Sequence, residues 1–597
     1  MQYPNLNIIK TQQLYTESFR GLDRRPRAGA GAFSDMLNMQ GSPLPLVSTR
    51  QRRGLAARLQ SPQALAAAGK IAYIDGNTLY YDHNPTPIND LSDEVPKRIA
   101  VMGAYLIVFP DAVYYNTVNP EDYGTINRLW TQEEGWEANI HLCAMDGIIF
   151  SDEDIPAADT APENPSEGDY WIDTSGDIHG LYRYSAVREE WEGIPTVYLR
   201  ISSKGIGSGL SRGDGVEISG IRGEDIDPDL MDQLEALNST HVIQGCGPDH
   251  IVITGMLDMQ HTQASGISVN RKAPKMDYVV ECNNRLWGCR YGETDGQMLN
   301  EIYASGLGDF KNFRNYVGTA GSYAVSVGTD GPFTGAINHR GTVYFFKQGY
   351  LHKIFGDNPS NYQMQTTILS GVQQGSENSL VSANGTLYYL SDYGVMMMES
   401  LPQNVGHALG EGWHSQGAAG EIDGKYYISM ADEAGTHAIY TLDLESGYWH
   451  KEDEKHAIAF ARTGRELYML CDDGKLWAIR GTEGEQEDLI PWRLDSAVFG
   501  FELANRKYIS RYNIRIKLGP WASCKFFVEY DSSGIWIPRG EMLGKDSIRT
   551  YTLPIIPRRC DHMRIRLEGR GDMTLYTIAR VIELGGDENG GNGNGNV

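Results

Sequence analysis

The chain has 597 residues, of which 41% are hydrophobic and 10% aromatic, and its formal net charge is -25. A chain of this length exceeds one ordinary hydrophobic core and is expected to divide into roughly three to five units. The acidic balance disfavours a simple nucleic-acid coat, because a uniformly acidic surface repels phosphate.

The cysteines and the first residues indicate the compartment. Seven cysteines are dispersed, odd in number and without a Cys-x-x-Cys pair, which indicates reduced core thiols and neither a disulfide framework nor a zinc ribbon. No charged segment followed by an apolar one opens the chain, and the longest apolar run, around residues 105–109, is too short to cross a bilayer. We expect folding in the cytoplasm, without a membrane anchor.

Residues 1–66 are predicted to form an extended basic arm. The first 60 residues hold nine Arg and Lys against three Asp and Glu, and several prolines disfavour helix. Arginine clamps carboxylates and phosphates, so the arm is predicted to dock on an acidic partner surface. Direct contact with DNA phosphates and a tail of incidental charge are the alternatives. The contact residues would be two basic groups: Arg24, Arg25 and Arg27, then Arg50, Arg52 and Arg53.

A glycine turn followed by an aromatic-rich strand recurs along the chain. The phrase begins at Gly76, Gly341, Gly385, Gly424, Gly464 and Gly474. From Gly341 to Gly464 its spacing is about 40 residues, the length of one four-stranded propeller blade. We therefore predict an all-β protein in which residues 67–150 and 271–490 form a β-propeller of roughly six to eight blades. A propeller is a platform, so the fold does not define the activity.

Between residues 151 and 270 the blade pattern breaks, which predicts an inserted, small β-rich module. Residues 229–238 are the best helix candidate in the chain, with leucines at helical spacing. Aromatic residues gather in the first half of the module. They either form its core, which we favour, or stack on the sugar rings of a glycan: Tyr170, Trp171, Tyr182, Tyr184 and Trp191.

The end of the chain contains one more predicted domain. Residues 491–584 hold several alternating apolar and polar runs, which predict a small antiparallel β-sandwich. Residues 585–597 consist mainly of Gly and Asn, a composition typical of disorder.

No catalytic constellation stands out. The 14 His residues lack metal-binding spacing, the Gly-rich stretch 205–209 lacks the strand-to-helix frame of a phosphate loop, and no carboxylate pair is marked as that of a glycosidase. We expect no enzyme, no catalytic residue, no metal and no cofactor.

Several segments together point to a family. Residues 328–335 (Gly-Thr-Asp-Gly-Pro-Phe-Thr-Gly) and 371–379 (Gly-Val-Gln-Gln-Gly-Ser-Glu-Asn-Ser), with 343–347, 354–362 and 387–395, resemble the propeller of tailed-bacteriophage tail proteins called stabilisation or nozzle proteins. Residues 507–511, 530–536 and 557–569 resemble the C-terminal sandwich of these proteins, and residues 19–23 and 48–54 fit the same family. The inserted module is not covered.

The resemblance implies a structural protein of the virion tail, assembled in the host cytoplasm. It would form a homo-oligomeric ring, six copies being favoured, that meets the portal or head-tail adaptor and other tail proteins. The ring would extend the DNA channel, help to retain packaged DNA and contact the genome transiently during ejection.

Two other functions remain open. A tail component could bind a host-surface glycan through the inserted module, or the propeller could be that of a glycosidase. Under the leading interpretation, removal of residues 1–60 is expected to leave a folded monomer that cannot join the portal complex.

Overall fold

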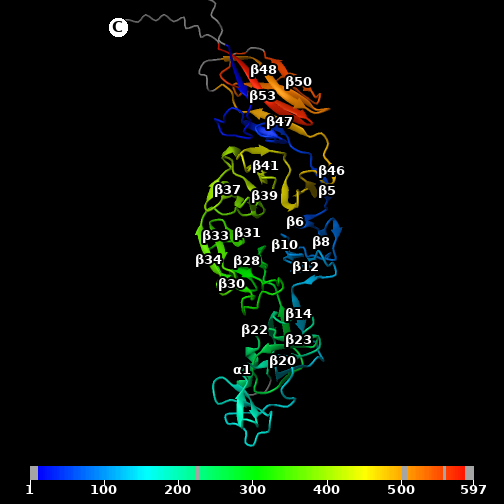
Figure 1. Cartoon of the computed structure of the whole chain (residues 1–597), viewed down its shortest axis with the longest axis vertical. Helices are drawn as coiled ribbons and strands as arrows, with labels where there is room; N and C mark the ends of the chain where they lie inside the picture. The colour runs from blue at the N-terminus through cyan, green and yellow to red at the C-terminus, as the bar shows by residue number, and fades with distance from the viewer. Residues whose placement is uncertain (1–10, 224–227, 501–506, 556–557, 559, 585–597) are drawn as a thin grey trace, which may run out of the picture.

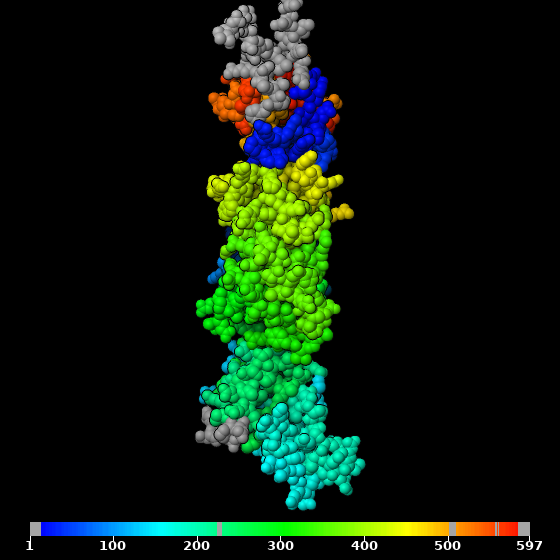
Figure 2. Space-filling model, turned by 90° about the vertical axis from the view of Figure 1, so that its left-hand side faces the viewer, coloured from blue at the N-terminus to red at the C-terminus, as the bar shows by residue number. Residues whose placement is uncertain are grey.

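The computed structural model describes residues 11–223, 228–500, 507–555, 558 and 560–584. Three units follow one another along a rod: a β-sandwich at one end, a β-propeller in the middle and the inserted module at the other end (Figures 1 and 2). The predicted all-β class is confirmed. Within the described residues one α-helix occurs, α1 (Pro228–Ala236), close to the predicted helix.

Seven blades form the propeller, inside the predicted range of blade numbers; six of the sheets have four strands and blade 7 has five. The first three are blade 1, with β6 (Pro62–Ala68), β7 (Lys70–Asp75), β8 (Thr78–Tyr81) and β9 (Asn84–Pro85); blade 2, with β10 (Arg98–Met102), β11 (Tyr105–Phe109), β12 (Val113–Asn116) and β13 (Tyr123–Thr125); and blade 3, with β27 (Tyr278–Cys282), β28 (Arg285–Thr294), β29 (Gln297–Ala304) and β30 (Tyr323–Ser326).

The other four blades complete the ring. They are blade 4, with β31 (Phe333–His339), β32 (Thr342–Lys347), β33 (Tyr350–Phe355) and β34 (Gln363–Ile368); blade 5, with β35 (Val381–Ala383), β36 (Thr386–Ser391), β37 (Gly394–Met398) and β38 (Pro402–Asn404); blade 6, with β39 (Ser415–Ile422), β40 (Lys425–Ala431), β41 (His437–Asp443) and β42 (Trp449–Lys451); and blade 7, with β43 (Ala457–Thr463), β44 (Glu466–Cys471), β45 (Lys475–Ala478) and β5 (Gly54–Arg58), which also pairs with β46 (Glu485–Gln486).

Four of the six recurring glycines lie in the turn between the first two strands of a blade, whereas Gly76 and Gly474 lie in the turn between the second and third strands of blades 1 and 7. Gly341, Gly385, Gly424 and Gly464 all occupy the turn between the first two strands with positive φ, which two-residue hairpin turns require. The second strand of each blade is buried on both faces, as in β36 and β44, because it lies between two neighbouring blades. This double burial explains the apolar, aromatic runs that follow these four glycines.

The ring is closed by a strand from the N-terminal segment. Strand β5 pairs with β45, so residues 54–58 complete the blade built mainly from residues 457–478. The first strand of blade 7 then contacts that of blade 1. The structure therefore differs from the predicted free arm: residues 54–66 belong to the propeller.

The inserted module lies between β13 and β27 and contains three sheets. It begins near residue 128, earlier than the predicted 151, because β14 pairs with β26 and β15 with β20. Its strands are β14 (Arg128–Thr131), β15 (Ala138–Cys143), β16 (Ala157–Ala158), β17 (Tyr170–Asp173), β18 (Gly180–Ser185), β19 (Glu190–Gly193), β20 (Tyr198–Ser202), β21 (Gly215–Ser219), β22 (Thr240–Val242), β23 (Gly245–Gly247), β24 (His250–Thr254), β25 (His261–Gln263) and β26 (Ser268–Arg271).

The sandwich joins both ends of the chain. One sheet has the order β3-β4-β53-β48-β51, with β1 also on β53, and the other has the order β2-β47-β52-β49-β50. Residues 11–49 are therefore part of the sandwich, which the arm prediction missed. The strands are β1 (Thr11–Thr16), β2 (Phe33–Leu37), β3 (Met39–Gln40), β4 (Val47–Thr49), β47 (Pro491–Ser496), β48 (Lys507–Leu518), β49 (Ser523–Tyr530), β50 (Ile537–Leu543), β51 (Ser547–Pro554), β52 (Met563–Arg570) and β53 (Met573–Leu584).

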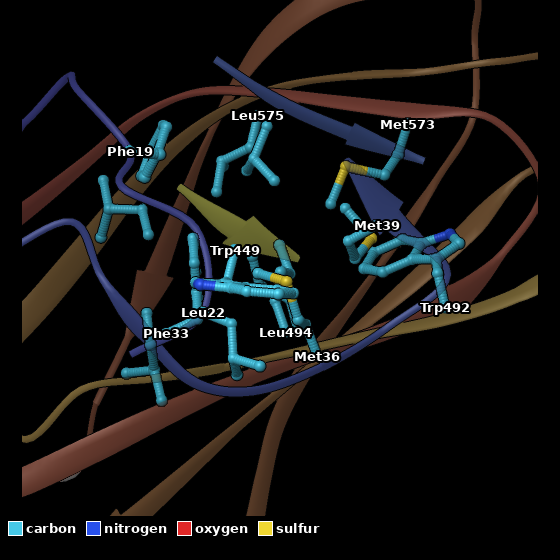
Figure 3. Packing of buried hydrophobic residues seen from close by; sticks show 14 of the residues in the cluster. Phe19, Leu22, Phe33, Met36, Met39, Trp449, Trp492, Leu494, Met573 and Leu575 are labelled. Atoms are coloured by element: carbon cyan, nitrogen blue, oxygen red, sulfur yellow. The ribbon is translucent and has the colours of Figure 1, made fainter. Parts of the chain in front are cut away.

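Propeller and sandwich share one hydrophobic core. Leu22 bridges to Trp449 of blade 6 and to Phe33 of the sandwich, and Trp449, Trp492 and Phe33 are each at most 2% exposed. Figure 3 shows these side chains packed between the N-terminal segment and both units. Apolar packing of this kind fixes the two units to each other.

Three remaining observations concern the ends, the cysteines and membranes. The predicted disordered tail, residues 585–597, lies outside the described residues. All seven cysteines are free thiols, and six of them are buried. Across the described residues, no helix has the length and apolar character needed to cross a membrane.

Candidate functional site

The propeller axis is closed at the end where the inner strands begin. The 3-10 turn η1 (Glu377–Ser379) contacts β31, β39 and β43, the inner strands of three different blades. A segment that reaches strands around the ring in this way lies across the axis. Its Glu377 carboxylate pairs at 3.1 Å with Arg98 of blade 2, and Asn378 donates to the carbonyl of Ile458 in blade 7.

We call η1 the plug; side chains of the surrounding blades hold it in place. Arg98 also donates to the carbonyl of Asp277 at 2.7 Å and lies over the ring of Tyr278. Buried Tyr426 donates to the Ser379 carbonyl at 2.8 Å.

The inner strands offer few charged groups to the axis. Glu281 and Glu421 are the carboxylates found on the seven inner strands, all of which are described. Glu281 accepts from the backbone N–H of Asn284, and Glu421 from that of Gly424 and from Arg462. Both carboxylates therefore stabilise hairpin turns.

Two of the predicted contact residues, Arg50 and Arg53, are buried. Arg53 donates to Asp453 at 2.8 Å and to Glu452 at 2.5 Å, and Arg50 donates to Glu487 at 2.6 Å. Burial alone would raise the pKa of Asp453, but Arg53, together with a nearby lysine, outweighs it and holds that pKa far below its usual range. These guanidinium groups are used inside the fold and do not face a partner or DNA, contrary to the prediction.

The other four predicted arginines lie nearer the surface. Arg52 pairs with Asp572 at 3.5 Å and Arg25 with Asp23 at 2.7 Å. Arg24 contacts both Asp35 and the Tyr440 hydroxyl, while Arg27 is exposed. Docking through these groups stays a prediction.

The aromatic residues of the inserted module pack on one another. Trp171 is 8% exposed, its ring lies 5.3 Å from that of Tyr182 and 5.6 Å from that of Trp191, and Tyr184 also packs on Trp191. Tyr170 packs on Phe150 at 5.0 Å. Trp171, Tyr182, Tyr184 and Trp191 thus pack on one another outside the main hydrophobic core of the module, against which Tyr170 packs. Both the core interpretation and glycan contact by these residues stay predictions.

A cavity of about 820 Å³ lies where the sandwich meets blades 5 and 6. We call it the junction groove; it is lined by residues 24–26, 392–395, 404, 406–407, 409–414 and 433. The Arg24 backbone donates to the carbonyl of Ala408, so the arginine turn of the N-terminal segment forms one wall. Blades 5 and 6 supply the others.

Exposed aromatic and acidic side chains line the junction groove. Tyr393 is 71% exposed and Trp413 is 49% exposed. The Glu433 carboxylate accepts from the backbone N–H of Trp413 at 3.1 Å, and Asn404 fixes the turn of Tyr393 by donating to its carbonyl at 2.6 Å. Both rings are thus held on short, hydrogen-bonded segments.

The groove combines both signs of charge with a neutral imidazole. Arg24 and Arg25 face it from the sandwich side, and exposed Asp392, Glu411 and Glu433 from the propeller side. Burial, together with the nearby Arg24 guanidinium, lowers the pKa of His414 below its usual range. No group of metal-ligating residues occurs among the described parts of the chain.

Comparisons with known proteins give no family. No family model matches the chain, and no curated protein matches it. Similar solved structures include an exo-beta-1,3-galactanase from Phanerochaete chrysosporium, 8% identical over 51% of this chain and 94% of that one, with a TM-score of 0.22. Another is an arabinoxylan arabinofuranohydrolase from Bacillus subtilis, 9% identical over 70% of this chain and 96% of that one, with a TM-score of 0.15.

These comparisons contradict the prediction that the chain is not an enzyme. Several of the similar structures are described as glycoside hydrolases, so that prediction is not retained. At such TM-scores the likeness carries no argument about substrate or mechanism.

Proposed function

We propose that the protein is a structural component of a bacteriophage tail, which assembles with further copies of itself into a ring around the DNA channel. The closed propeller axis is the observation that carries this proposal. Since the turn η1 lies across one end of the axis, we expect DNA to pass outside the propeller, between subunits that pack against one another through its outer surfaces.

The way in which the sandwich and the propeller are joined supports the same role. The N-terminal segment runs through both sheets of the sandwich, crosses the shared core and closes blade 7. A subunit that must bear the pressure of packaged DNA needs joints of this kind, in which units are fixed by buried area and not by a flexible linker.

The charge of the inserted module fits a surface that DNA passes without binding. Residues 144–194 contain thirteen Asp and Glu against two Arg, Arg183 and Arg188, and no Lys. All but one of these acidic side chains are exposed. Such a surface repels phosphate.

The ring is tested by measuring the mass of the full-length protein in solution, alone and mixed with the portal and adaptor of its phage. We expect a closed ring, with six copies favoured, either alone or on the portal. A monomer under both conditions would contradict the proposal.

A propeller glycosidase is the second candidate. The similar solved structures include carbohydrate-cleaving enzymes and so agree better with this alternative than with a tail protein. Their TM-scores are too low for this agreement to carry an argument. It predicts hydrolysis of an oligosaccharide that is lost on replacing one carboxylate. Release of reducing sugar by the wild-type protein, and its loss in such a variant, would favour it.

A further inference from the structure

The junction groove has a lining suited to a polyhydroxylated ligand. Its volume of about 820 Å³ lies within the range of small-molecule sites. Tyr393 and Trp413 expose large parts of their rings at its walls, although most aromatic side chains of the propeller strands are buried. Tyr393 lies in the turn between β36 and β37 of blade 5, and Trp413 lies in the segment that connects blades 5 and 6. The fold therefore brings rings from two separate loops to the same cavity.

We propose that the junction groove binds a neutral oligosaccharide. Aromatic rings offer flat apolar faces on which the C–H face of a pyranose can lie. Sugar hydroxyls both donate and accept, so they can donate to Glu433 or Asp392 and accept from Arg24 or Arg25 at the same site. The neutral imidazole of His414 can donate a hydrogen bond through one ring nitrogen and accept one through the other.

The charges of the junction groove disfavour an anionic ligand. A nucleic acid would bring phosphates next to three exposed carboxylates, Asp392, Glu411 and Glu433, which repel them. On the opposite wall, Arg24 and Arg25 pair with Asp35 and Asp23, which neutralise part of their charge. Their other N–H groups can act as hydrogen-bond donors to a neutral ligand.

This site differs from the glycan site predicted in the inserted module. There, Trp171, Tyr182 and Trp191 pack on one another, whereas in the junction groove the corresponding ring faces are exposed. The inference does not depend on ring assembly, and the two can fail separately.

The test is binding of maltohexaose, cellohexaose and chitohexaose to the full-length protein, measured by saturation-transfer NMR and calorimetry. We expect at least one of them to bind, and Trp413→Ala and Tyr393→Ala each to weaken that binding tenfold or more. Trp521→Ala is the matched control, because Trp521 is 89% exposed on the sandwich, away from the groove lining; its affinity should equal that of the wild type.

Several outcomes would overturn the proposal. They are no binding of any of the three sugars at millimolar concentration, binding that both groove variants retain, or binding that Trp521→Ala loses equally. Thermal unfolding of each variant reports its folding. If Trp413→Ala fails to fold, Tyr393→Ala decides, since Tyr393 lies on an exposed turn, and Glu433→Gln provides a second variant of nearly the same shape.

Discussion

Arg53 lies in a basic group that the sequence predicts to be on the surface, but its side chain is buried. It stands in a dense basic group, yet its partners Glu452 and Asp453 are 399 and 400 residues away along the chain. Charged clusters are usually solvated, so the sequence favoured an external role for both segments. The tertiary structure pairs them because the N-terminal segment returns to the loop between blades 6 and 7.

Removing the Arg53 charge should be costly. Arg53→Met keeps much of the side-chain volume but leaves buried Glu452 and Asp453 without their main counter-ion. We expect a loss of about 3–5 kcal/mol in the free energy of unfolding, measured by urea denaturation.

The exposed Arg27 provides the control. Arg27→Met changes the same charge within the same basic group, and we expect it to alter stability by less than about 0.5 kcal/mol. Equal effects of the two substitutions would show that the buried cluster does not contribute in the way the geometry suggests.

The blade is the element that repeats, and its inner hairpin carries the sequence signal. The glycine with positive φ and the doubly buried second strand recur because every blade meets the same two constraints, a tight turn and a neighbour on each face. Among the described blades, blade 7 is the one that contains a strand, β5, from a distant part of the sequence. No local pattern marks β5, since its partner β45 lies more than 400 residues later.

The fit of β5 can be tested at Gly54. A Cβ atom there would lie 1.8 Å from the carbonyl oxygen of Glu483, so Gly54→Ala must displace the closing strand. We expect a loss of about 1–3 kcal/mol by urea denaturation and faster proteolysis within residues 54–58.

Gly349→Ala is the matched control, because a Cβ atom at Gly349 meets nothing within 4 Å. Its stability and its proteolysis pattern should equal those of the wild type. If Gly54→Ala behaves in the same way as this control, β5 does not close the ring as tightly as the contacts indicate.

At the scale of the whole molecule, the N-terminal segment holds the rod together and the inserted module extends it. The module enters and leaves the propeller through the paired strands β14 and β26, with Arg128 opposite Arg271, and it has a hydrophobic core of its own. The segment 11–58, in contrast, supplies strands to both sandwich sheets and to blade 7.

Because of these roles, the structure predicts a different outcome for the truncation of residues 1–60 than the sequence did. Deleting residues 1–60 removes β1 to β5, so we expect a loss of cooperative unfolding and aggregation, and not a folded monomer. Replacing residues 128–271 with a short Gly-Ser linker should leave one cooperative transition from the propeller and sandwich. Calorimetry distinguishes these outcomes, and a cooperative, soluble protein after the first deletion would contradict the structure.

The sequence alone determined the all-β class, the propeller, the insertion and the sandwich, because turn residues and strand periodicity are local and repeat. It could not place the junction groove, since Tyr393 and Trp413 lie in two separate loops that only the fold brings to one exposed cavity. The buried ion cluster, the plug on the axis and the closing strand depend on contacts between residues hundreds of positions apart. Only the tertiary structure decided these, because burial and charge pairing are properties of neighbours in space.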